Sequence, residues 1–148
     1  MRKFILDLVN SFNTNDSDHD SVNIDQATAV LLVEVMAADH EWDDIESNAI
    51  KDILITQFSL NSEEAEALLS DSTQSQQKAN DLYQFTKVIT ENFSHDQRYE
   101  MLVNLWKVAF ADGQVDRYEE HMIRKITDLL HMPHTQYIRA KHQADPTS

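Results

Sequence analysis

Two stretches of this sequence carry the same pattern of carboxylates, Asp-x-x-x-Asp-x-x-Glu. The copies lie at 39–46 and 112–119, at a constant offset of 73 residues. Their carboxylates are Asp39, Asp43 and Glu46 in the first copy, and Asp112, Asp116 and Glu119 in the second. When 31–54 is compared with 104–127, eight of the 24 positions are identical, and three of these are carboxylates. Core packing alone would not select carboxylates, so the repeat points to an acidic site.

The chemistry that this pattern suggests is the binding of a hard divalent cation. Carboxylate oxygens and exposed helix-end carbonyls are the ligands that Ca²⁺ or Mg²⁺ prefers. A tight turn between two helices would bring the three carboxylates of each copy together. Nearby acids that add ligands or only negative charge are Glu34, Glu41, Asp44 and Glu120. The pattern is not an EF-hand, because position 6 counted from Asp39 is Asp44 rather than Gly and position 12 is Ile50 rather than Glu.

The same pattern also has a purely structural interpretation. The middle Asp of each copy would cap a helix, and the Glu three residues later would complete a capping box. Capping accounts for Asp43, Glu46, Asp116 and Glu119. It leaves out Asp39 and Asp112, which we expect in the last turn of the preceding helices, where the negative end of the helix dipole disfavours a carboxylate. Capping and cation binding are compatible, and both stay open at this point.

The elements that position these residues are predicted to be helices. One glycine and two prolines in 148 residues leave few turn signals. Apolar residues recur at helical spacing, and no segment shows sustained strand alternation. We therefore expect a single all-α domain over 1–148 with about seven to eight helices. Two related hairpins, 24–58 and 95–131, are joined by connecting helices, and the offset of 73 predicts a pseudo-symmetry between them.

The helix boundaries follow from caps and breaks in the pattern. An amphipathic helix is predicted at the start of the chain by the spacing of Phe4, Ile5, Leu8, Val9 and Phe12. An acidic loop is expected to follow it over 13–22. The next helix, from Asn23 to about residue 40, is apolar around most of its circumference and should be central. Three of the remaining helices are expected over 43–58, 81–93 and 116–131. Another begins at residue 61 and frays over 72–78, and another begins at a capping box formed by Ser94 and Gln97. A short last helix follows Pro133, and 142–148 are expected to be a disordered tail. Gly113 is expected in the left-handed conformation at a helix end, with His40 in that place in the first copy.

Charge and composition limit the function. The net charge is −14, and 4–50 contains eleven carboxylates and no Lys or Arg. Such a surface repels nucleic acid and anionic lipid, and it suits cations or a basic protein partner. The absence of cysteine excludes disulfides and thiolate metal sites. Asp7 interrupts the apolar start too early for an export signal, and no apolar run is long enough to span a membrane. We expect a cytoplasmic protein without membrane insertion, present as a monomer or weak homodimer.

Two segments carry a resemblance to a known family. They are Leu105–Arg124, with the sequence LWKVAFADGQVDRYEEHMIR, and Asp81–Thr86, with the sequence DLYQFT. Over about 31–141 the chain resembles the TerB-like family, named for tellurite-resistance operons, and it looks most like the short stand-alone bacterial branch.

The resemblance implies a pseudo-symmetric helical domain, an acidic cluster proposed to bind divalent cations, and an association with resistance to tellurite and other stresses. The cluster falls on Asp39, Asp43, Glu46, Asp112, Asp116 and Glu119. In the first copy His40 replaces the Gly of the usual Ala-Asp-Gly pattern, so the second copy matches the family better. A related domain is fused to membrane-anchored co-chaperones, which implies a docking role as the alternative.

The leading hypothesis is a non-enzymatic protein that binds divalent cations at its two acidic turns in a metal or oxyanion stress response. The alternative is an interaction module whose acidic face binds a basic protein partner without metal. An enzyme with paired carboxylates ranks last, because it needs an apolar pocket that raises one pKa, whereas these acids are expected in exposed turns.

Overall fold

The computed structural model describes residues 23–38, 44–78 and 81–147. In these ranges the chain forms seven helices and no strand, which confirms the all-α prediction. They are α2 (Ile24–Ala37), α3 (Asp44–Phe58), α4 (Ser62–Lys78), α5 (Tyr83–Asn92), α6 (His95–Phe110), α7 (Arg117–Leu129) and α8 (His134–Ala144). None of these helices is both long and apolar enough to cross a membrane. The helix predicted over 4–12 and the loop predicted over 13–22 lie outside the described residues.

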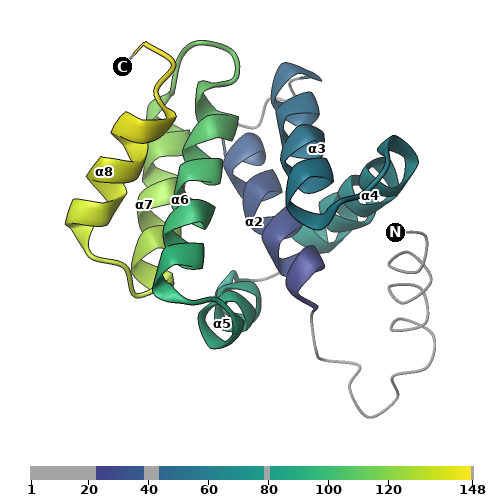
Figure 1. Ribbon diagram of the computed structural model, residues 1–148, viewed down its shortest axis with the longest axis horizontal. Coiled ribbons are helices and arrows are strands. Elements are labelled where there is room, and N and C mark those ends of the chain that lie inside the picture. Colours follow the sequence, from purple (N-terminus) through teal and green to yellow (C-terminus); the bar gives the residue numbers. More distant parts are fainter. Residues whose placement is uncertain (1–22, 39–43, 79–80, 148) are drawn as a thin grey trace.

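Helix α2 is the central element, as its apolar circumference predicts. Figure 1 shows it between α3 and α4 on one side and α6, α7 and α8 on the other. It packs against α3, α4, α5, α6 and α7. From Gln26 to Met36 every residue except Glu34 is buried. A helix that is apolar on all sides must be surrounded by other elements, and this arrangement provides them.

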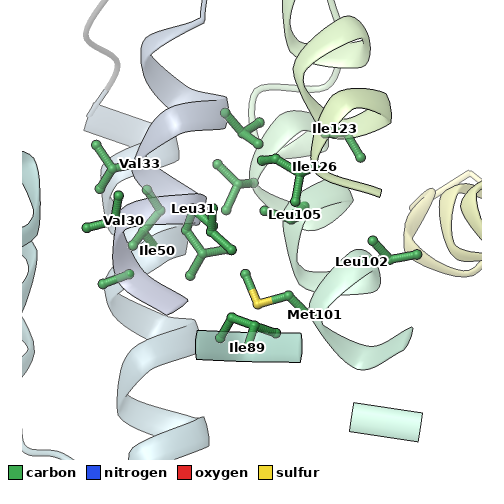
Figure 2. Close-up of a cluster of buried hydrophobic side chains, with 14 of the residues drawn as sticks. Val30, Leu31, Val33, Ile50, Ile89, Met101, Leu102, Leu105, Ile123 and Ile126 are labelled. Carbon is green, nitrogen blue, oxygen red and sulfur yellow. The ribbon is translucent and has the colours of Figure 1, made fainter. Parts of the chain in front are cut away.

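The hydrophobic core joins the two sides of the molecule through α2. In Figure 2, Leu31 of α2 lies between Ile50 of α3 and Leu105 of α6, and all three side chains are fully buried. Ile89 of α5 and Met101 of α6 lie together at one end of this cluster. The core is therefore shared by both halves of the repeat.

Two predicted helix starts are confirmed by their capping hydrogen bonds. The Asn23 side chain accepts from the Gln26 N–H at 2.7 Å at the start of α2. At α6, the Ser94 hydroxyl accepts from the Gln97 N–H at 3.2 Å, and the Gln97 side chain accepts from the Ser94 N–H at 2.8 Å. Each bond satisfies a backbone donor that a helix start leaves without an intrahelical partner.

The predicted fraying of the fourth helix is wrong, because α4 continues through the Gln- and Ser-rich stretch to Lys78. Ser72 is fully buried. The Gln26 side chain of α2 donates to the Ser75 hydroxyl at 3.0 Å, and Gln76 donates to the Glu34 carboxylate at 3.3 Å. Polar residues of α4 thus pair with the few polar residues of α2, and this packing outweighs their modest helix propensity.

The helix at the C-terminal end is longer than expected. Pro133 is the N-cap of α8, and the helix runs to Ala144. Residues 142–144, which the sequence places in a disordered tail, are therefore helical. Tyr137 and Ala140 are buried and attach α8 to α6.

The helix bounds follow the offset of the sequence repeat. Helices α3 and α7 begin at Asp44 and Arg117, and α2 and α6 end at Ala37 and Phe110, so both pairs are separated by 73 residues. A spatial pseudo-symmetry of the two hairpins stays a prediction.

Helices α3 and α7 also end in the same way. Ser59 and His131 follow these helices with φ of 55° and 59°, a left-handed conformation that is uncommon outside glycine. In each case the next N–H, that of Leu60 or Met132, bonds back to the last helical turn at 3.2 or 3.1 Å. Leu60 and Met132 are both buried. Such ends satisfy free carbonyl groups and bury an apolar side chain against the helix.

Candidate functional site

The second acidic turn connects α6 to α7 at one end of the molecule (Figure 1). The N–H of Gly113 donates to the carbonyl of Phe110, the last residue of α6, at 2.8 Å. Gly113 has a φ of 95°, which confirms the left-handed conformation predicted for it. Apart from Gly113 itself and its two chain neighbours, no described residue has an atom within 4 Å of the place where its Cβ would be. Glycine is therefore favoured here by the backbone conformation rather than by a lack of space.

Asp112 does not lie where the sequence places it. Helix α6 ends at Phe110 with Ala111 as its C-cap, so Asp112 follows the helix instead of occupying its last turn. Its exposed carboxylate accepts a hydrogen bond from the Gln114 N–H at 3.1 Å. Asp commonly stabilises a turn by bonding to the backbone two residues ahead. Asp112 therefore has a local structural role in the turn after α6.

Asp116 and Glu119 form the capping box predicted for α7. Asp116 Oδ1 accepts from the Glu119 N–H at 2.8 Å, and Glu119 Oε1 accepts from the Asp116 N–H at 3.2 Å. Glu119 is only 1 % exposed, whereas Asp116 is half-buried. The Glu side chain therefore lies inside the protein, where it fixes the start of α7.

A further capping box with a buried glutamate lies outside the acidic repeat. At the start of α4, Asn61 and Glu64 exchange two side chain to backbone hydrogen bonds of 2.8 Å each. Glu64 is also buried. A buried glutamate at the third position of a helix is thus a recurring capping device of this fold, and it does not by itself indicate a cation site.

The first acidic turn is described only in part. Glu46, in the first turn of α3, is 2 % exposed, which matches the burial of Glu119 in α7. Asp39 and Asp43, together with His40, lie outside the described residues. The predictions made for these three positions therefore stay predictions.

The carboxylates of the second turn do not form a ready three-ligand metal site. In 23–38, 44–78 and 81–147, no three His, Asp or Glu side chains lie together as metal ligands would. Asp112 and Asp116 each use one oxygen to hold the backbone, and their Oδ2 atoms accept no hydrogen bond from the described residues. Glu120, a further candidate ligand, instead pairs with Lys141 at 3.0 Å. A cation at this turn would need water molecules or residues from elsewhere to complete its shell.

The capping role of Asp116 can be measured directly. We expect Asp116→Ala to lower the free energy of unfolding by about 1–2 kcal/mol, because the Glu119 N–H at the start of α7 loses the carboxylate oxygen that caps it. Asp116→Asn keeps the acceptor and should cost less than about 0.5 kcal/mol. Urea unfolding followed by circular dichroism gives both values. Equal losses in the two variants would show that charge, rather than the cap, is what Asp116 contributes.

A groove between α3 and α6 is a feature that the sequence did not reveal. It has a volume of about 840 Å³ and is lined by Ala49, Asp52, Ile53, Thr56, Gln57, Phe58, Phe93, Asp96, Gln97, Glu100, Asn104 and Lys107. Asn104 of α6 donates to Gln57 of α3 across it at 3.3 Å. Its apolar residues have the same helical spacing as core residues, so periodicity alone cannot show that they remain half-exposed.

Comparison with known proteins identifies the family. The family model described as Tellurite resistance protein TerB matches residues 25–142. The chain belongs to the TerB family. No curated protein and no solved structure gives a significant match.

The matched region of this TerB-family chain contains all six carboxylates of the acidic repeat. It also covers the seven described helices except for the first residue of α2 and the last two residues of α8. It extends the resemblance expected over about 31–141 by a few residues toward the start of α2. The membership supports a relation to tellurite resistance, and it assigns no ligand to the acidic turns.

Two carboxyl groups with raised pKa values lie outside the second acidic turn. Burial raises the pKa of Asp25, in the first turn of α2, to about 6. Burial also raises the pKa of Glu34, although the hydrogen bond from Gln76 opposes this effect. Neither residue belongs to the second acidic turn or lines the α3–α6 groove. In the described part of the chain, the groups best suited to proton transfer are thus not at the predicted site.

Proposed function

We propose that this TerB-family protein is a non-enzymatic binding protein that holds a divalent cation, Ca²⁺ or Mg²⁺, at its acidic turns during metal or oxyanion stress. The observation that supports this is the state of the second turn. Asp112 is exposed, and both Asp112 and Asp116 commit one carboxylate oxygen to the backbone while the other remains available. The backbone is thereby held in place before a ligand arrives, which lowers the entropic cost of binding.

The proposed cation is shared between protein oxygens and water. Mg²⁺ keeps several waters and commonly uses only one or two carboxylates, and Ca²⁺ accepts six to eight oxygens in a flexible shell. Asp112 and Asp116 fit such a partial set. The set of proposed ligands is completed by Glu119 and, in the first copy, by Asp39, Asp43 and Glu46. We place the protein in the cytoplasm, as a monomer or weak homodimer.

Calorimetric titration with Ca²⁺, Mg²⁺, Mn²⁺ and Zn²⁺ tests this proposal. We expect Asp112→Ala to raise the Kd of the preferred cation at least tenfold, equal to about 1.4 kcal/mol. Asp128→Ala is the matched control, since it removes one exposed carboxylate from α7 outside the turn and should leave the Kd unchanged. Absent or unchanged millimolar binding in wild type and Asp112→Ala would refute the proposal.

A second candidate is an interaction module that binds a basic protein partner without metal. It is favoured by exposed carboxylates on one surface, those of Asp52 on α3 and of Asp96 and Glu100 on α6. An interaction of this kind should weaken at high salt and be indifferent to a chelator. A cation-dependent function should respond to the chelator.

A further inference from the structure

The α3–α6 groove has an apolar floor that remains partly uncovered. It is lined by Ile53 and Phe58 of α3 and by Phe93, which precedes α6. All three side chains pack against the core, but each is only half-buried. Figure 1 shows α3 and α6 facing each other across the front of α2. Large apolar side chains in a concave surface favour an occupant with an apolar face.

The rim of the groove is acidic. Asp52, Asp96 and Glu100 are exposed around it, and Lys107 is its one basic lining residue. The neighbouring Lys51 does not neutralise the rim, because it is paired with Glu66 at 2.8 Å. The occupant should therefore combine an apolar stripe with positive charge.

We propose that the occupant is residues 4–12 of this same chain, packed as an amphipathic helix in the α3–α6 groove. The segment has five apolar residues at helical spacing, Phe4, Ile5, Leu8, Val9 and Phe12. Arg2 and Lys3 directly precede it and are the only Lys or Arg residues before Lys51. The apolar stripe thus fits the floor, and the two bases fit the rim. This inference goes beyond cation binding and does not depend on it.

The connection to α2 is long enough for this arrangement. Residues 13–22 can span up to about 33 Å when extended. Helix α2 has 14 residues and is therefore about 21 Å long. Both α3 and α6 pack against α2, so the linker can reach the groove from the start of α2 in either direction. Tethering also gives the segment a millimolar effective concentration, which favours it over a free partner of similar affinity.

Paramagnetic broadening in NMR spectra of the full chain tests the proposal. The chain has no cysteine, so Asn10→Cys provides a single attachment point for a nitroxide label. We expect the Ile53 methyl signal and the amide signals around Glu100 to lose more than about half of their intensity. The Ile138 methyl of α8, which does not line the groove, should keep its intensity. Equal broadening at both places, or none at the groove, would overturn the proposal.

Variants of the groove provide the matched controls. Ile53→Asp should restore the amide signals around Glu100, whereas Ile138→Asp, a charge placed at an exposed residue of α8, should not. If Ile53→Asp unfolds the protein, the double variant Asp96→Lys, Glu100→Lys provides the same test, because both residues are exposed and their reversal repels Arg2 and Lys3. Unchanged broadening in the double variant would contradict the proposed charge match.

A mixed sample identifies the source of the segment. Isotope-labelled protein without nitroxide is combined with nitroxide-labelled protein without isotopes. We expect no groove broadening in this mixture, because the segment binds within its own chain. Broadening in the mixture would show instead that the groove receives a second copy and would refute the intramolecular assignment.

Discussion

Trp106→Ala is expected to lower the free energy of unfolding by about 3–5 kcal/mol. Trp106 is fully buried on α6. Its ring lies 5.2 Å from that of Tyr137 and 6.0 Å from that of Phe110, and the Lys141 ammonium lies 5.3 Å from its centre. Removing the indole leaves a large cavity between α6 and α8 and also removes a cation–π contact. Urea unfolding followed by circular dichroism measures the loss.

Trp106→Phe separates the contribution of volume from that of polarity. The indole Nε1 is buried and has no hydrogen-bond acceptor in the described part of the chain, so phenylalanine sacrifices no hydrogen bond there and removes an uncompensated polar group. We expect a cost of about 1–2 kcal/mol, well below that of alanine. If Trp106→Phe and Trp106→Ala lowered the free energy of unfolding by similar amounts, the ring of the phenylalanine would contribute little to the packing between α6 and α8.

Leu31→Ala is the second large effect, with an expected loss of about 2–5 kcal/mol. Leu31 is fully buried on the central helix and lies between α3 and α6 in the core (Figure 2). A cavity at this position is bordered by helices from both halves of the repeat, so the surrounding structure cannot collapse by moving one element. Thermal and urea unfolding should both show the loss.

Ile138→Ala on α8 is the control for Leu31→Ala. Ile138 is 38 % exposed, so its truncation removes less buried surface and should cost less than about 1 kcal/mol. If Leu31→Ala cost no more than Ile138→Ala, α2 would not be the central element of the fold.

Several elements could be predicted because their signals are local in the sequence. The Ser94–Gln97 and Asp116–Glu119 boxes join residues three apart, and Gly113 meets a backbone requirement at its own position. Helix α2 was predicted to be central because its own side chains are apolar on all sides. These signals do not depend on what packs nearby, and the structure confirms each of them.

Other features could not be predicted because they depend on neighbours distant in the chain. The fourth helix continues past Ser72 because α2 supplies partners and burial for its polar residues. A smaller difference is that α6 ends at Phe110, which places Asp112 after the helix rather than in its last turn. Helix ends are uncertain by one or two residues in sequence reasoning, and the difference at Asp112 is of this size.

The acidic repeat itself shows where the division lies. The sequence alone determined the helical class, the capping residues, the TerB resemblance and the spacing of the six carboxylates, because these are carried by residue type and short-range periodicity. Only the tertiary structure decided that Glu119 is buried, that Asp112 holds a turn after α6, and that α3 and α6 leave a half-exposed apolar groove. Burial and concavity arise from the packing of whole helices, and no local pattern encodes how completely one helix covers another.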